Sequence, residues 1–265
     1  MLIFRSYQFY LMNKNKVLGI DIGGSGIKAA PVNTENGKML AKRHRIPTPQ
    51  PITPKTVAPV IAEMVRHFKW KGIIGCGFPT VVQKGVAKTA ANVDDSWIGT
   101  DVNKLFRKAT GLPVYVVNDA DSAGMAEMRF GAGKNVSGLV FLCTIGTGIG
   151  TVLFTNGHLV PNMELGHIEL NGMDAEKQVS DAVRKAENLP WEEWAIRFSG
   201  YLKAIEKLIY PDLIILGGGA SKKGEKFIHF LDLSTPVVTA RLLNDAGLIG
   251  AAIAGNYQHK LFSKK

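Results

Sequence analysis

Short apolar runs that end in glycine or in a polar residue alternate with amphipathic segments along this chain. Apolar runs of strand length predict buried strands at residues 17–24, 72–78 and 114–119. Residues 26–33 and 38–46 also have a strand pattern, and the Asn-Gly step between them is a strong hairpin signal. The first part of the chain therefore predicts several strands, two of them joined as a hairpin.

Amphipathic segments separate these strands. Apolar residues recur at helical spacing over residues 55–68, which predicts a helix there. A short helix is expected after Asp101, whose side chain can cap it, and residues 120–130 also have a helical pattern. Strands and helices thus alternate, as they do in α/β proteins.

The same order of elements occurs again further along the chain. Residues 139–154 predict a strand, a glycine turn and a second strand, and helices are expected over much of residues 174–210. A strand at 212–217 then opens into another glycine turn, and a small, apolar last helix at about 244–260 is expected to be buried. An α/β protein of two similar lobes with a cleft between them follows from this duplication.

We place the lobe boundary at the end of the third buried strand. Residues 1–118 are expected to form a smaller N-terminal α/β lobe and residues 119–243 a larger C-terminal one. The last helix is expected to pack back onto the first lobe.

Charge is the unusual feature of the composition. The chain has 265 residues, 46% of them hydrophobic, and carries a formal net charge of +10 with a pI near 9.5. Such a charge favours an anionic partner, although a solvated basic surface would look the same. The basic residues stand in small scattered groups with no basic helix that interleaves aromatics, so nucleic acid is not the favoured partner.

The N-terminal residues are partly apolar, but they predict neither a membrane span nor a signal peptide. The run is short and Arg5 interrupts it. Met12 is an alternative start, which would make residues 1–11 an extension. We therefore expect no membrane association.

Cysteine is scarce. Cys76 and Cys143 each lie inside an apolar run, which favours two buried thiols in a reducing, cytoplasmic compartment. Two cysteines cannot form a cysteine-rich zinc site, so no zinc is expected.

Three glycine loops each follow a predicted strand. Glycine lets backbone N–H groups approach an oxyanion closely, and a Ser or Thr adds a hydroxyl donor. None of the three matches a Walker loop or a good dinucleotide fingerprint. A single loop of this kind is usually only a turn, but three of them at strand ends predict phosphate binding. Their candidate residues are Gly23, Gly24 and Ser25, then Thr144, Gly146, Thr147 and Gly148, then Gly217, Gly218 and Gly219.

Asp21 ends the first strand beside its glycine loop. A carboxylate there would repel phosphate unless a cation lay between them, which indicates Mg²⁺ held directly or through water. The alternative is an aspartate that caps a turn. Lys28 can point to the same phosphates or to solvent.

Asn118 and Asp119 end the third buried strand. A carboxylate at the carboxyl end of such a strand faces the crevice where α/β proteins place ligands, so Asp119 is a candidate general base for a hydroxyl nucleophile. Capping of the following helix is the alternative role for Asp119, although Asp121 can also serve as the cap.

Residues 164–169 combine two carboxylates and an imidazole in six positions, namely Glu164, His167 and Glu169. Such a set suits a polyhydroxyl ligand, because sugars need paired hydrogen-bond donors and acceptors. Metal ligation is the alternative for His167, but no cysteines accompany it.

The motifs together resemble the ROK sugar kinases of the actin-like ATPase superfamily. DIGGSGIK resembles the family's first phosphate motif, VNDADSAGMAE its catalytic segment, TIGTGIG its second phosphate motif, ELGHIE its sugar segment and LGGGAS its nucleotide-side motif. All five occur in the family's order. The resemblance implies a two-lobed, ribonuclease H-like fold with a central cleft, and a homodimer.

Within that family the chain is most similar to the polyphosphate glucokinase group, in TPQPITP, TAANVDDSWIGT and FGAGKN. That group also lacks the cysteine-rich zinc motif of most ROK kinases. The resemblance implies phosphoryl transfer from polyphosphate, ATP or both to the 6-hydroxyl of glucose, with mannose a further acceptor. It implies that Asp119 is the base and that Asn92, Asn118, Glu164, His167 and Glu169 bind the sugar.

One position departs from the family pattern. Pro79 is followed by Thr80 where the family usually has glycine, and this side chain can narrow the sugar pocket or add a hydroxyl contact.

Three functions compete on this basis. The first is a kinase that uses polyphosphate, with ATP as a second donor, for which Lys222, Lys223 and Lys226 can form a basic track. The second is a glucokinase that uses only ATP. The third is a sugar-sensing regulator without activity, disfavoured because about sixteen residues before the first strand are too few for a helix-turn-helix domain.

Overall fold

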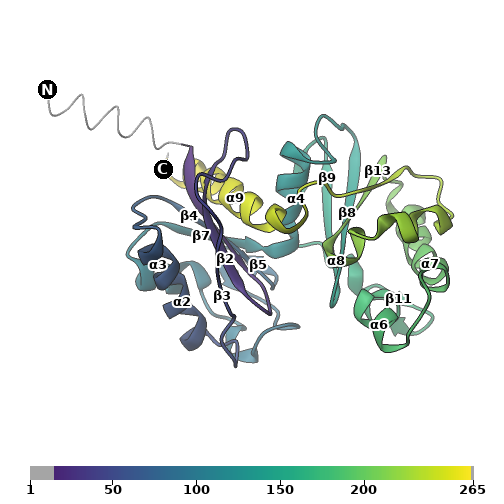
Figure 1. Cartoon of the computed structure of the whole chain (residues 1–265), viewed down its shortest axis with the longest axis horizontal. Helices are drawn as coiled ribbons and strands as arrows, with labels where there is room; N and C mark the ends of the chain where they lie inside the picture. Colours follow the sequence, from purple (N-terminus) through teal and green to yellow (C-terminus); the bar gives the residue numbers. More distant parts are fainter. Residues whose placement is uncertain (1–14, 264–265) are drawn as a thin grey trace, which may run out of the picture. The chain divides into compact units, whose positions relative to one another are not determined.

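The chain folds into two units, each built on its own five-stranded sheet (Figure 1). The computed structural model describes residues 15–263, so the question of a start at Met12 lies outside the described residues. Unit 1 comprises the described residues up to Ala126 and those from Asp245 onward, and unit 2 runs from Glu127 to Asn244. The division falls inside a helix rather than at residue 118, and unit 1, which includes the last helix, is the longer one.

The sheet of unit 1 has the order β3-β2-β1-β4-β7. The hairpin strands pair antiparallel, whereas β1, β4 and β7 run parallel. The strands are β1 (Lys16–Ile22), β2 (Ile27–Asn33), β3 (His44–Ile46), β4 (Ile74–Phe78) and β7 (Val114–Asn118), and the short hairpin β5 (Val82–Gln83) and β6 (Val86–Ala87) lies outside this sheet.

One prediction in this region was too long. The strand expected over residues 38–46 is present only as β3, and a single bridge joins Met39 to Val32. The Asn-Gly turn does form, with Gly37 at φ 73° and its N–H donating to the Asn33 carbonyl at 2.9 Å. The chain after the turn leaves the ladder before it pairs again at His44.

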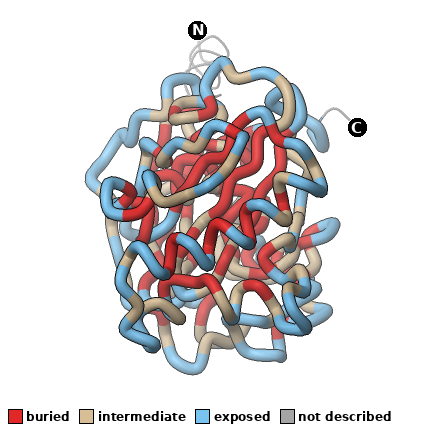
Figure 2. Tube along the Cα trace, turned by 90° about the vertical axis from the view of Figure 1, so that its right-hand side faces the viewer, coloured by how far each residue is buried: buried red, intermediate tan, exposed pale blue. Residues whose placement is uncertain are grey.

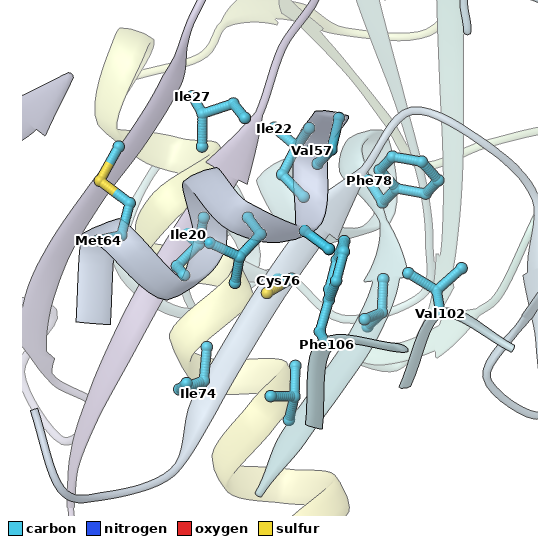
Figure 3. Close-up of a cluster of buried hydrophobic side chains, with 14 of the residues drawn as sticks. Ile20, Ile22, Ile27, Val57, Met64, Ile74, Cys76, Phe78, Val102 and Phe106 are labelled. Carbon is cyan, nitrogen blue, oxygen red and sulfur yellow. The ribbon is translucent and has the colours of Figure 1, made fainter. Parts of the chain in front are cut away.

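Alternate residues of the strands of unit 1 face a core formed with α2 (Pro54–His67) and α3 (Val102–Thr110) (Figure 3). Ile20 and Ile22 of β1 lie there with apolar side chains of both helices. Thr53 caps α2 in a capping box, and Asp101 caps α3 as predicted, because its carboxylate accepts from the Lys104 N–H at 2.8 Å. The 3-10 turn η1 (Asp95–Trp97) adds Trp97 to the same core.

The last helix, α9 (Ala246–Phe262), packs backbone against backbone on the strands of unit 1. A Cβ on Gly19 would lie 2.2 Å from the Leu248 carbonyl oxygen, and one on Gly75 only 1.8 Å from that of Ala251. Glycine at these strand positions, and small residues in the helix, are therefore required for the close approach. The expected burial of this helix is confirmed, since residues 248–256 are all buried.

The sheet of unit 2 repeats the order of unit 1, as β10-β9-β8-β13-β14. Again the first two pairings are antiparallel and the last two parallel. The two-lobed α/β fold predicted from the duplicated pattern is confirmed. The strands are β8 (Leu139–Ile145), β9 (Ile149–Thr155), β10 (His158–Val160), β13 (Leu213–Gly217) and β14 (Val237–Thr239).

The core of unit 2 is aromatic. Trp194, Phe198 and Tyr201 of α7 (Trp191–Ile209) lie with Phe141 and Phe227, all fully buried. In Figure 2 buried stretches follow the inner strands and helices, and exposed stretches follow the connections. The shorter helical elements are α5 (Glu176–Val179), α6 (Asp181–Ala186), α8 (Gly218–Ser221), η3 (Gly224–Lys226), η4 (Ile228–Phe230) and η5 (Leu243–Asp245). The chain returns to unit 1 at Asp245.

The two cysteines are free and fully buried, as predicted. Burial raises the pKa of the Cys76 and Cys143 thiols far above its ordinary value. Both therefore act as small apolar core residues.

Candidate active site

The first glycine loop connects β1 to β2 in unit 1. The Gly23 N–H donates to the Gly26 carbonyl at 3.2 Å, which closes the turn. Gly24 and Ser25 are exposed, and nothing lies within 4 Å of where a Gly24 side chain would point. The loop is thus held at its base and open at its tip, as a loop that receives an anion must be.

Asp21 stands directly before this loop and pairs with Lys28. The Lys28 ammonium nitrogen lies 3.1 Å from the Asp21 Oδ2 atom, and the two side chains are 27% and 16% exposed. The carboxylate also faces the first turn of α9, since a Cβ on Gly247 would lie 3.0 Å from Asp21 Oδ1. Lys28 therefore points to the carboxylate beside the loop and not only to solvent.

Asp119 is the first residue of α4 (Asp119–Phe130), and its neighbour Asn118 caps that helix. The Asn118 Oδ1 atom accepts from the Asp121 N–H at 3.0 Å, and its amide nitrogen donates to the Thr80 carbonyl at 3.1 Å. The capping role expected of Asp119 or Asp121 therefore belongs to Asn118. The Asp119 carboxylate is half-buried and accepts from the Ala120 N–H at 2.8 Å. Helix N-termini stabilise negative charge.

Two further predicted sugar residues lie in unit 1. Thr80 is buried, 3% exposed, and its carbonyl holds Asn118, so it supports the start of α4. Asn92 is exposed in a turn before η1.

The sugar segment of unit 2 is a cluster of charged groups around η2 (Leu165–His167). The His167 Nδ1 atom lies 2.9 Å from Asp174 Oδ2, and its Nε2 atom lies 3.9 Å from Glu164 Oε2. Burial by itself would lower the pKa of His167, but the Asp174 hydrogen bond and the neighbouring carboxylates raise it above its ordinary value. The imidazole is therefore protonated more readily than usual and can donate from Nε2.

Glu164 has the opposite electrostatic setting. Burial raises the pKa of its carboxyl, the charge of His167 lowers it, and the charge of Glu176 raises it, with a net rise. A carboxyl that is less readily ionised, next to a protonated imidazole, presents both a donor and an acceptor to a hydroxyl-rich ligand.

The structure adds Glu176 to this cluster, and it pairs Glu169 with Asp174, the residue that contacts the His167 imidazole. Glu169 is exposed on the two-stranded pair β11 (Glu169–Leu170) and β12 (Met173–Asp174). The Glu176 charge acts on both Glu164 and His167. We did not single out Glu176 in the sequence because it lies beyond the Glu164–Glu169 run, inside a segment with no other signal.

Glu176 also joins this cluster to the second glycine loop. Its Oε2 atom accepts from the Ile149 N–H at 2.6 Å, and a Cβ on Gly148 would lie 2.3 Å from the same oxygen. Within the loop, the Gly146 N–H donates to the Gly148 carbonyl at 3.0 Å. Thr147 is exposed, while the Thr144 hydroxyl donates to the Gly150 carbonyl at 3.3 Å. Sugar segment and phosphate loop thus form one connected structure in unit 2.

The third glycine loop follows β13 and lies against the second. Gly218 has φ 79°, and a Cβ there would lie 2.5 Å from the Ile145 nitrogen, so only glycine fits. Gly218 and Gly219 are exposed, whereas Gly217 is buried at the strand end. A cavity of about 800 Å³ adjoins this loop, lined by Ser221, Lys222, Gly224, Glu225, Ile228, His229, Thr239, Ala240 and Leu243.

Within residues 15–263 no group of three or more His, Cys, Asp or Glu side chains could by itself hold a metal ion. Mg²⁺ commonly uses one or two carboxylates together with water and substrate phosphates. Asp21, a single carboxylate beside a phosphate loop, fits that mode of binding. The same described residues include no helix with the length and apolar character needed to cross a bilayer.

Comparison with known proteins decides the family. Residues 17–187 match the ROK family, and a polyphosphate glucokinase of Mycobacterium tuberculosis is 48% identical over 237 residues, which cover 89% of each chain. The chain belongs to the ROK family. The family predicted from the five motifs is confirmed.

Solved structures agree with this assignment. The inorganic polyphosphate/ATP-glucomannokinase of Arthrobacter sp. strain KM superposes with a TM-score of 0.88 at 45% identity, covering 92% of this chain and 99% of that one. A ROK family glucokinase of Streptomyces griseus, in complex with glucose and AMPPNP, superposes with a TM-score of 0.78 at 24% identity, covering 91% of this chain and 99% of that one. The second likeness shows the shared fold.

Proposed function

We propose that this ROK protein is a kinase that transfers a terminal phosphoryl group from inorganic polyphosphate or ATP to the 6-hydroxyl of glucose. The observation that carries the proposal is the arrangement at the start of α4, where Asn118 caps the helix and the half-buried Asp119 carboxylate stands at its first residue. The high identity to a polyphosphate glucokinase and to a polyphosphate/ATP-glucomannokinase supports glucose as acceptor and both donors.

Asp119 acts as the general base in this mechanism. Its carboxylate takes the proton from the 6-hydroxyl as that oxygen bonds to phosphorus, and the phosphorus–oxygen bond to the remaining donor breaks. Asn118 fixes the backbone from which Asp119 projects. Lys28 and the backbone of the glycine loops stabilise the charge on the phosphoryl oxygens. Mg²⁺, held by Asp21 and the donor phosphates, would neutralise further charge on those oxygens.

The sugar hydroxyls are bound by Glu164, His167 and Glu176, with Asn92, Asn118 and Thr80 as further contacts and Glu169 as a weaker, outer one. Protonated His167 donates, while the carboxylates accept. Mannose is a second acceptor to test. We further propose a cytoplasmic homodimer.

A strictly ATP-dependent glucokinase is the second candidate, and one observation favours it. The cavity beside the third glycine loop combines apolar side chains with Lys222 and Ser221, a lining that suits a nucleoside joined to phosphates.

A donor-by-sugar matrix tests the proposal. ATP, GTP and polyphosphate are each assayed with glucose, mannose and N-acetylglucosamine. Asp119→Asn is expected to lower kcat by about 10²- to 10⁴-fold with every donor, because the base is lost, while glucose still binds. Asp95→Asn, an exposed carboxylate of η1, is the matched control. Near-normal turnover by Asp119→Asn would show that another group is the base, and no phosphorylation of any sugar by the unaltered enzyme would overturn the function.

A further inference from the structure

Three charged residues form a row across the strands next to the first glycine loop. Asp21 of β1 is paired with Lys28 of β2, and Lys28 is paired in turn with Arg45 of β3. Directly paired residues of neighbouring strands project from the same face of a sheet. The row therefore lies on the Asp21 face, and it ends at β3, which is the edge strand of this sheet.

The row has an excess of positive charge. Like charges in directly opposed positions destabilise a strand pair, so Lys28 and Arg45 side by side need a compensating anion. Asp21 compensates Lys28 at 3.1 Å. Among the described residues, the only hydrogen-bond partner of Arg45 is the Ser25 carbonyl, at 2.6 Å from Nη2. The positive charge of Arg45 at the loop is therefore not paired with any carboxylate of the part of the chain that the structure describes.

Arg45 is positioned by the loop itself. A Cβ on Gly26 would lie 2.4 Å from Arg45 Nε and 2.6 Å from both Cζ and Nη2, so the guanidinium lies across a glycine. Gly26 is buried, whereas Arg45 is exposed. The planar guanidinium has five N–H donors, and a single bond to Ser25 leaves others to bind a phosphate in a forked geometry.

Two further basic residues, Lys42 and Arg43, lie in the chain directly before β3. Lys42 is exposed, and Arg43 forms an ion pair with Asp245 at 2.7 Å. ATP carries negative charge on three phosphoryl groups, whereas polyphosphate carries negative charge on every phosphoryl group of a longer chain. Arg45 at the loop, with Lys42 and Arg43 directly before its edge strand, suits the longer anion.

We propose that Arg45, positioned over Gly26, is a phosphate-binding residue that contacts an internal phosphoryl group of inorganic polyphosphate beside the first glycine loop. This inference rests on the proposed function. It adds to that function a residue, Arg45, that favours polyphosphate as the phosphoryl donor. Arg45 lies outside the five motifs quoted above, and Gly26, although inside DIGGSGIK, was given no role of its own.

Four variants of the full chain test this role. Arg45→Ala removes the guanidinium, and Arg45→Lys keeps the charge but not the fork. Gly26→Ala keeps the charge but displaces the guanidinium. Arg66→Ala removes an exposed cation from the last turn of α2 and is the matched control. The readouts are KM for polyphosphate of defined length, KM for ATP and for glucose, and calorimetric binding of polyphosphate without glucose.

We expect Arg45→Ala to raise KM for polyphosphate about tenfold and to weaken its binding by a similar factor, because a charge-assisted bond is lost. The slope of log binding constant against log salt concentration should decrease by an amount equal to about one released counterion. Arg45→Lys should be intermediate, and Gly26→Ala should shift KM in the same direction as Arg45→Ala. KM for glucose should not change, and Arg66→Ala should behave as the unaltered enzyme.

Equal effects of Arg45→Ala and Arg66→Ala on polyphosphate would overturn the inference, as would a Gly26→Ala enzyme with unchanged polyphosphate KM. If the unaltered enzyme uses polyphosphate and Arg45→Ala does too with the same KM, only the role of Arg45 fails. If the unaltered enzyme neither binds nor uses polyphosphate but uses ATP, the inference fails together with the polyphosphate donor, and the kinase activity stands.

Discussion

The two units share one strand order but differ in the chemistry at equivalent positions. In unit 1 the residue before the end of the first strand is Asp21, opposite Lys28, whereas in unit 2 it is Thr144, opposite Gly150. The following turns are residues 23–26 and residues 146–148. The same strand arrangement therefore holds an ion pair in one unit and a hydroxyl in the other. This difference indicates that the side chains at the strand ends, and not the shared strand order, set the function.

The units also differ in how a helix packs on the strands. Unit 1 brings α9 onto its strands through glycines, with backbone atoms in contact, while unit 2 fills its core with large aromatics from α7. The first solution tolerates no added volume at the contact, because backbone atoms cannot move aside. Matched substitutions in the two units separate these designs.

The largest effect is expected from Gly75→Ala in unit 1. Its Cβ would lie 1.8 Å from the Ala251 carbonyl oxygen, so the helix must shift, at a cost of about 3 kcal/mol or more. Gly200→Ala in α7 meets nothing within 4 Å and should stabilise the protein by about 0.5–1 kcal/mol. Denaturant unfolding measures both, and a Gly75→Ala protein as stable as the unaltered one would contradict the close packing.

The strand-end pair is tested by Asp21→Asn and Thr144→Val. Loss of the Asp21 charge should lower kcat/KM for the donor about a hundredfold and change its Mg²⁺ dependence, whereas loss of the Thr144 hydroxyl should cost about tenfold. Steady-state kinetics at several Mg²⁺ concentrations measure both values. If both variants lost kcat/KM equally and their Mg²⁺ dependence were unchanged, Asp21 and Thr144 would have the same role in donor binding.

A third comparison lies inside unit 2, between Glu176 and Glu169. Glu176→Gln should raise KM for glucose about tenfold, because it removes a charged acceptor next to Glu164 and His167. Glu169→Gln should have a smaller effect, since this side chain is exposed and neighbours the cluster through Asp174, its partner in the β11–β12 pair. The reverse order of the two KM values would restore Glu169 as the main sugar ligand.

The smallest effect concerns His167 and Asp174. The pKa of His167 is raised in the folded protein above its ordinary value of 6.5. Protonated His167 therefore stabilises the folded protein fully at pH values below 6.5, and this contribution is lost as the pH rises through the folded pKa. Asp174→Asn should move this pKa down toward 6.5, as an NMR titration of the imidazole would report. Because His167 is 38% exposed, solvent screening limits the stability effect to about half a kcal/mol. An unchanged titration would show that Asp174 does not set the charge of His167.

The sequence by itself determined the buried strands, the duplicated order of elements, the cap at Asp101 and the buried last helix. These features follow from apolar periodicity and from capping residues, both of which act over a few neighbouring positions. It also located the three glycine loops, because they directly follow apolar strands. The weak point was the 38–46 strand, where a local turn signal was right but the pairing beyond it depended on distant contacts.

Only the tertiary structure decided which neighbouring acidic or amide residue caps α4, because Asn118 reaches that role through a bond to Thr80, a residue of another strand end. The same holds for Glu176, which joins the second glycine loop through the Ile149 N–H, and for Arg45, which lies over Gly26 through strand pairing. Contacts between residues far apart in the chain depend on sheet register and helix packing, and no local pattern encodes these.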